Sequence, residues 1–159
     1  MAAIMQFHIA DANELPRLRS IAYHSEAHWG YSREFMEIFD RKFNIDTGFL
    51  RKNPVYSGKI QETTVGFWGM QEVDSCLPEL EYFYIAPEYL NQGLGKIMWE
   101  HMTAWCKGQG ISAFTFVTSP QAVGFYEKMG AAVSGERFSS IDGRRIPLLE
   151  YRQPQHSGR

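Results

Sequence analysis

The chain has 159 residues, of which 44% are hydrophobic and 21% are charged, a composition typical of a globular protein with an ordinary core. Its formal net charge is −2 and its pI is near 6.2, so it lacks the basic excess that attracts nucleic acid or an anionic membrane. We therefore expect one domain over residues 1–152, a loose tail over residues 153–159, and a small molecule as the partner.

The first third of the chain is predicted to form a strand and two helices. Polar and apolar residues alternate from 4 to 9, as they do in a strand. Asp11 and Glu14 form a capping box that begins a helix over about 12–27. An aromatic turn follows, after which Ser32 caps a second helix that extends to about residue 43.

The middle of the chain is predicted to contain three strands. Two alternating runs over 55–60 and 63–71 indicate a hairpin. A third run, over 79–86, ends at Pro87 because proline has no N–H to donate to a ladder. Strict alternation divides the third strand between two faces. One face is expected to carry Leu80, Tyr82, Tyr84 and Ala86, and the other Glu79, Glu81, Phe83 and Ile85.

The remaining elements complete an α/β pattern. The elements expected are a helix from about 94 to 107, a strand over 112–118, a short helix between 120 and 130, and two strands over 133–138 and 146–151. Asp142-Gly143 is a typical hairpin turn between the last two strands. This order of helices and strands indicates a sheet with mixed strand directions.

The loop from Asn91 to Lys96 stands between a predicted strand and a predicted helix and contains Gly93 and Gly95. Two glycines allow close approach of a ligand where the helix presents unpaired N–H groups, so the loop predicts a phosphate cradle. Two common phosphate motifs do not fit. A dinucleotide fingerprint needs a third glycine at Met98, and a Walker loop needs longer glycine spacing and a hydroxyl residue at Ile97.

The segment Leu90-Asn91-Gln92-Gly93-Leu94-Gly95 resembles motif A of the GCN5-related N-acetyltransferases, Q/R-x-x-G-x-G/A, although Leu90 replaces the usual Gln or Arg. The segment 122–130, with Phe-Tyr-Glu-Lys before a glycine, is similar to the second signature of the same family. The resemblance implies the GNAT-type acyl-CoA N-acyltransferase fold, with about six to seven strands in a mixed sheet and about four helices. It also implies acetyl-CoA as co-substrate, with no metal.

The resemblance also implies where the co-substrate binds. In the family the sheet splays after the strand that carries motif A, and the pantetheine arm pairs with the free strand edge. The residues expected to bind the co-substrate are Phe83, Tyr84, Ile85, Asn91, Gln92, Gly93, Leu94, Gly95, Lys96 and Ser119, the last standing where many relatives have Asn.

Three residues are candidates for catalysis. The position of Tyr126 in the second signature implies that its phenol protonates the departing thiolate, although a packing role is the alternative. An alkyl amine with a pKa near 10 is only about 10⁻³ neutral at pH 7, so a base is useful. Glu79 and Glu81 are the candidates for that base, and two solvated carboxylates are the alternative. 

The acceptor is expected to lie near the turn after the first helix. His28, Trp29 and Tyr31 are candidates to border its pocket, or else to anchor the next helix. The resemblance therefore implies transfer of an acetyl group to the primary amine of a small molecule, by direct attack in a ternary complex. A protein or peptide acceptor, a non-catalytic acyl-CoA sensor, and assembly as a homodimer stay open.

The cysteines and histidines bear on location and metal binding. Cys76 and Cys106 stand at no metal-ligand spacing, and no signal peptide or long apolar run is visible, so a reducing cytoplasmic location is expected. His24 and His28 stand one helical turn apart, but no third ligand accompanies them, and no metal site is expected.

Overall fold

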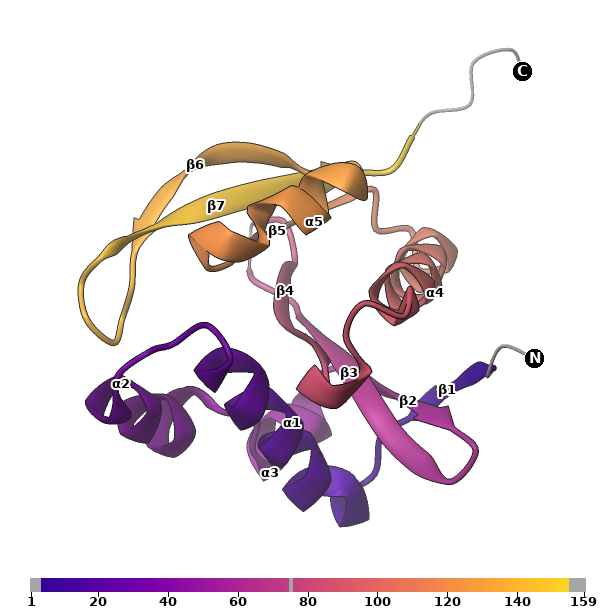
Figure 1. Cartoon of the computed structure of the whole chain (residues 1–159). Coiled ribbons are helices and arrows are strands. Elements are labelled where there is room, and N and C mark those ends of the chain that lie inside the picture. The colour runs from indigo at the N-terminus through magenta and orange to yellow at the C-terminus, as the bar shows by residue number, and fades with distance from the viewer. Residues whose placement is uncertain (1–3, 75, 155–159) are drawn as a thin grey trace.

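The computed structural model describes residues 4–74 and 76–154 and contains a seven-stranded mixed sheet with strand order β1-β2-β3-β4-β5-β7-β6 (Figure 1). The strands are β1 (Met5–Ile9), β2 (Val55–Ile60), β3 (Thr63–Gln71), β4 (Glu79–Ile85), β5 (Ala113–Val117), β6 (Ala132–Phe138) and β7 (Arg145–Arg152). The β4–β5 pair is parallel and the other pairs are antiparallel. The expected α/β fold is confirmed.

Helices cover both faces of the sheet. They are α1 (Leu15–Ala27), α2 (Arg33–Ile38), α3 (Thr47–Lys52), α4 (Leu94–Gly108) and α5 (Val123–Lys128). One apolar core joins α4 and α5 to the sheet, and a second joins α1 and α2 to its other face. Trp68 and Met98 are fully buried in the first core, and Leu18 and Phe67 in the second. Burial of these large side chains is the main stabilising contribution to both layers.

Local caps begin the helices of the N-terminal third. Asp11 and Glu14 form the expected capping box, although the first turn is a 3-10 helix (Ala12–Glu14) that leads into α1. The Ser32 side chain accepts a hydrogen bond from the Phe35 N–H at 3.1 Å and begins α2. The structure adds α3, which was not expected, and Asp46 caps it through the Phe49 N–H at 2.8 Å. A six-residue helix is too short for its periodicity to stand out in sequence.

The expected division of β4 between two faces is wrong for Leu80. In the pairing with β3, Gly69 is opposite Tyr82 and Met70 is opposite Leu80, so Glu81 is an extra, bulged residue. Leu80 consequently packs in the core with α4, whereas Tyr82 packs in the core with α1. A bulge interrupts the two-residue period, and strict alternation therefore misplaces the residues that precede it.

The sheet opens between its two central strands, as expected. Within the described residues, β4 and β5 pair at a single position, Glu79 with Thr115, and then diverge. The edge of β4 from Glu81 to Ile85 is therefore free of a neighbouring strand on its β5 side. An unpaired edge of this kind presents backbone donors and acceptors that a ligand can use.

Two general properties concern the described residues as a whole. None of the helices formed by residues 4–74 and 76–154 is long and apolar enough to cross a membrane. Within the same residues, no three His, Cys, Asp or Glu side chains come together in a group that could hold a metal ion. The first residue of the expected tail, Gln153, donates through Nε2 to the Thr103 carbonyl at 2.9 Å, and residues 155–159 lie outside the described part of the chain.

Candidate active site

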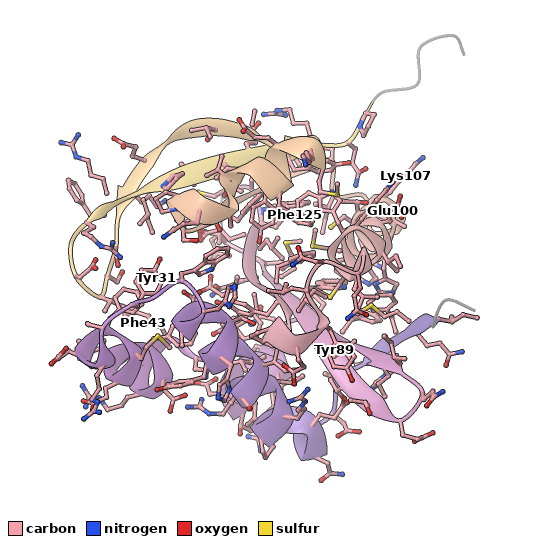
Figure 2. All side chains as sticks on the ribbon, viewed as in Figure 1. Tyr31, Phe43, Tyr89, Glu100, Lys107 and Phe125 are labelled. Carbon is pink, nitrogen blue, oxygen red and sulfur yellow. The ribbon has the colours of Figure 1, made fainter. Side chains whose placement is uncertain are left out.

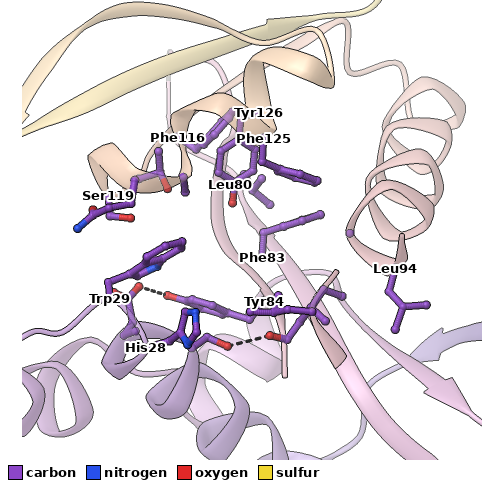
Figure 3. Close-up of a pocket in the computed structure, with 18 of the residues that line it drawn as sticks. His28, Trp29, Leu80, Phe83, Tyr84, Leu94, Phe116, Ser119, Phe125 and Tyr126 are labelled. Carbon is purple, nitrogen blue, oxygen red and sulfur yellow. Dashed lines mark hydrogen bonds between the residues drawn. The ribbon is translucent and has the colours of Figure 1, made fainter. Parts of the chain in front are cut away.

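A cavity of about 520 Å³ occupies the opening between β4 and β5 (Figure 3). Its walls come from α1 and the turn after it, from β4, from the start of α4, and from the segment between β5 and α5. The predicted site residues that line it are His28, Trp29, Glu81, Phe83, Tyr84, Ile85, Asn91, Gly93, Leu94, Gly95, Lys96, Ser119 and Tyr126. Three predicted residues, Glu79, Gln92 and Tyr31, are not part of its lining.

The predicted phosphate cradle lies at the N-terminus of α4. Asn91 and Gly93 have left-handed backbone conformations, with φ of 63° and 80°, and turn the chain sharply into the helix. No side chain caps the helix at Gly93, so its first N–H groups are available to an anion. A methyl group at Gly95 would lie 3.0 Å from the Phe125 ring, and this position therefore also keeps α4 close to α5.

Ser119 adds a buried hydroxyl group to the wall of this cavity. Its hydroxyl oxygen is buried and has no hydrogen-bond partner among the described residues. Buried hydroxyl groups are nearly always paired in proteins, because desolvation without a partner is costly. The hydroxyl and the uncapped α4 terminus together fit a long ligand with phosphate at one end and polar groups along its length.

The free edge of β4 presents backbone groups to the same cavity. The Ala86 N–H donates to the Val65 carbonyl of β3 at 2.8 Å, and successive backbone groups of an extended chain point to opposite edges. The N–H and carbonyl of Ile85 therefore point away from β3. The Ser25 hydroxyl, from α1, donates to that carbonyl at 3.0 Å, whereas the N–H of Ile85 faces the open side.

Tyr126, on α5, packs among aromatic side chains at the wall of the cavity. Its ring makes an edge contact with Phe116, with centroids 4.7 Å apart, and a second edge contact with Phe83 at 6.0 Å. Burial raises the pKa of the phenol well above its usual value, and the negative charge of Glu26 raises it further. The phenol is therefore fully protonated near neutral pH and can donate a proton.

The two strand glutamates have different surroundings. Glu79 Oε2 lies 3.0 Å from Nη1 of Arg137, on β6, and only 23% of the Glu79 side chain is exposed. Glu81 lines the cavity and forms no ion pair within the described residues. Burial raises the pKa of the Glu81 carboxyl, and the charge of Glu79 raises it further, although Arg137 lowers it.

The aromatic residues of the turn after α1 line two different hollows. The side chains of His28 and Trp29 border the cavity, with 37% of Trp29 exposed. Tyr31 lies nearer the hairpin between β6 and β7 (Figure 2), stacked on Phe35 at 4.1 Å with the Arg144 guanidinium 5.2 Å from its ring centroid. These contacts place Tyr31 in a neighbouring hollow that includes Ile141 and Asp142.

Residue-by-residue reasoning from sequence missed Ser25 and Glu26, which also line the cavity. Both continue the buried stripe of α1, since Ile21 and Ser25, like Ala22 and Glu26, are four residues apart. A polar residue on the apolar stripe of a helix was the available signal. The Tyr84 hydroxyl donates to Oε1 of Glu26 at 2.7 Å.

Comparison with known proteins identifies the family. The family model described as "Acetyltransferase (GNAT) family" matches residues 16–131, which is most of the chain. The chain belongs to this family. GNAT proteins are acyl-CoA-dependent N-acetyltransferases that use acetyl-CoA as co-substrate, and the α4 terminus, the free β4 edge and the unpaired Ser119 hydroxyl fit that molecule.

Two curated relatives match parts of the chain. A Bacillus subtilis (strain 168) protein with the name "Putative acetyltransferase BSU40680" is 42% identical over 65 residues, which cover 41% of this chain and 44% of that protein. The peptidyl-lysine N-acetyltransferase YjaB of Salmonella typhimurium is 36% identical over 77 residues, which cover 47% of this chain and 50% of YjaB. The chain thus matches about half the length of each relative.

A solved structure gives the wider view of the GNAT fold. The PaiA N-acetyltransferase of Thermoplasma acidophilum, in complex with coenzyme A, superposes with a TM-score of 0.79. The match covers 94% of this chain and 99% of the other, at 19% sequence identity. At that identity the similarity concerns the fold, in agreement with the seven-stranded sheet and its helical layers.

Proposed function

We propose that the protein transfers the acetyl group of acetyl-CoA to the primary amine of a small molecule, by direct attack within a ternary complex. The observation that carries the proposal is one continuous cavity. It joins the uncapped N-terminus of α4 to the phenol of Tyr126 and the carboxylate of Glu81. A cradle for phosphate, a proton donor and a proton acceptor thus border one space of about 520 Å³.

Each of the chain's own groups has a role in this proposal. The Ile85 N–H, which faces the open edge, donates a hydrogen bond to the thioester carbonyl and stabilises the negative charge that develops on its oxygen. Glu81 accepts a proton from the amine, directly or through water. Tyr126 donates its proton to the thiolate as the carbon–sulfur bond breaks. Acetyl-CoA, when bound, supplies the activated acetyl group.

The surroundings of the cavity support a small acceptor. His28 and Trp29 line the cavity on the side of α1, where the acceptor is expected, and a short amine needs less open surface than an extended peptide. A peptide or protein lysine is the second candidate, because one relative is named a peptidyl-lysine N-acetyltransferase. A sensor that binds acetyl-CoA without transfer is less well supported, since a buried phenol borders the cavity at Tyr126.

A panel assay tests the proposal. Release of coenzyme A thiol would be measured with short alkyl amines and with lysine-containing peptides at equal amine concentration. Turnover of the short amines is expected. Turnover of peptides alone would replace the small acceptor with a peptide acceptor, and tight binding of acetyl-CoA without turnover of any amine would indicate a sensor.

A further inference from the structure

Glu26 lies in the last turn of α1 and borders the cavity opposite the β5–α5 segment. The Tyr84 hydroxyl donates a 2.7 Å hydrogen bond to its Oε1 atom, shown as a dashed line in Figure 3. Tyr84 projects from β4 and is itself packed in the core with α1. Two elements of different layers therefore hold this one carboxylate at the wall of the cavity.

The charged groups along the cavity are arranged by sign. Among the described residues that line it, Glu26 and Glu81 are the carboxylates, and Lys96 is the one lysine or arginine. Lys96 lies in the first turn of α4, where the positive end of the helix dipole also lies. The cavity is thus positive at the start of α4, whereas Glu26 gives the wall formed by α1 a negative charge.

The carboxylate of Glu26 lacks a cationic partner within the described residues. Burial raises the pKa of the Glu26 carboxyl, and the hydrogen bond from Tyr84 lowers it by less. No lysine, arginine or histidine of residues 4–74 and 76–154 forms an ion pair with it. A partly buried carboxylate with one neutral donor is incompletely compensated, and a cation beside it would favour its charged form.

The position of Glu26 relates it to the reacting groups. The Tyr84 hydroxyl lies 2.7 Å from its Oε1 atom, and Glu26 and Tyr126 line the same cavity. Tyr126 is the proposed proton donor. A cation bound to Glu26 would therefore lie beside the proposed reaction centre and on the side of the cavity away from the α4 cradle.

We propose that Glu26 binds the acceptor as an ammonium ion and so selects cationic amines over neutral ones of the same shape. This inference rests on the proposed amine acetylation and names the group that recognises the acceptor. Tyr84 is a positioning residue, because its hydroxyl holds the Glu26 carboxylate. The ammonium donates its N–H groups to the carboxylate before Glu81 removes one proton.

The kinetic test compares two acceptors in four proteins. The acceptors are an alkyl amine, which is charged at pH 7, and an O-alkylhydroxylamine of the same length, which is neutral. The proteins are the wild type, Glu26→Gln, Tyr84→Phe and the control Glu37→Gln. Glu37 is an exposed carboxylate on α2 outside the cavity, so its substitution makes the same change in net charge.

We expect Glu26→Gln to raise KM for the alkyl amine by about tenfold or more, with KM for the neutral acceptor and kcat for both within about threefold. Tyr84→Phe should shift the same KM in the same direction by less. Glu37→Gln should change neither. An unchanged KM for the alkyl amine in a folded Glu26→Gln variant would overturn the inference. A fall in kcat at constant KM would also overturn it, because Glu26 would then act as the base.

A binding experiment separates this inference from the proposed function. Calorimetric titration of the alkyl ammonium into protein saturated with coenzyme A needs no turnover. Weaker binding in Glu26→Gln and Tyr84→Phe, but not in Glu37→Gln, supports the ammonium site even if no amine is acetylated. Equal binding in all four proteins overturns it while leaving amine acetylation intact. If Glu26→Gln does not fold, as judged by circular dichroism, Tyr84→Phe carries the same comparison.

Discussion

Arg137 on β6 donates to the carboxylate of Glu79 on β4, with Nη1 and Oε2 3.0 Å apart. The two residues are 58 positions apart in the chain, and the pair occupies the end of β4 where the sheet begins to open. Glu79 is thereby held against β6, while Glu81 is left to the cavity. This difference separates the two candidate bases.

The first prediction concerns Glu81 as the base. Glu81→Gln should lower kcat/KM by about 10²-fold near neutral pH, with recovery as the pH approaches the pKa of the amine, because the free amine then needs no base. Rate profiles against pH would test this. A wild-type profile in Glu81→Gln would rule out Glu81 as the base.

The Glu79→Gln variant makes a second, opposite prediction. The charge of Glu79 contributes to the raised pKa of the Glu81 carboxyl, and Arg137 opposes it. Removing the Glu79 charge should therefore lower the pKa of Glu81 and move the acidic limb of kcat/KM to lower pH, with the maximal rate within a few-fold. A large loss of kcat at all pH values would instead identify Glu79 as the reacting carboxylate.

Tyr126→Phe distinguishes a proton donor from a packing residue. The ring and its contacts with Phe116 and Phe83 are retained, so thermal stability should change little. Loss of a positioned donor should lower kcat by about 10² to 10⁴, whereas the dissociation constant of acetyl-CoA should stay within a few-fold. Single-turnover experiments would measure the rate of transfer, and calorimetry would measure the dissociation constant of acetyl-CoA. An unchanged kcat would show that Tyr126 has a packing role and is not the proton donor.

Gly95→Asp tests the phosphate cradle. The new carboxylate would stand in the first turn of α4 and press on the Phe125 ring, which lies 3.0 Å from the position of the added Cβ. We expect acetyl-CoA to bind at least about tenfold more weakly, or about 1.4 kcal/mol, through charge repulsion with phosphate. Gly108→Asp, at the other end of the same helix and with open space around it, is the matched control and should bind as the wild type does.

The lowered pKa of His101 predicts how the stability of the fold depends on pH. Its ring stacks on Phe7 at 4.1 Å and accepts a hydrogen bond from Trp68 Nε1 at Nδ1, 3.2 Å away. Burial lowers the pKa of this imidazole below 6.5, so the unfolded chain binds a proton more readily than the folded one. Stability from His101 should be complete above about pH 6.5 and should fall as the pH drops toward the folded pKa. Chemical unfolding of wild type and His101→Asn between pH 7.5 and 5 would measure the difference, which should narrow on the acidic side.

Local signals in the sequence were enough for most elements and for the glycine-containing turn before α4. The hairpin over 55–60 and 63–71 and the capping box at Asp11 depend on neighbouring residues, as does the glycine pair before α4. Because these interactions span only a few positions, alternation and capping residues report them directly.

The tertiary structure decided which carboxylates face the cavity and which are paired elsewhere. The bulge at Glu81 depends on pairing with β3, and the ion pair of Glu79 depends on a strand 58 residues away. Glu26 became part of the cavity because α1 packs on the sheet beside Tyr84. A sequence displays residue types and short spacings. Contacts between distant segments determine which carboxylate is paired, which lies in a bulge and which faces the cavity. Those segments come together only when the layers of the fold pack.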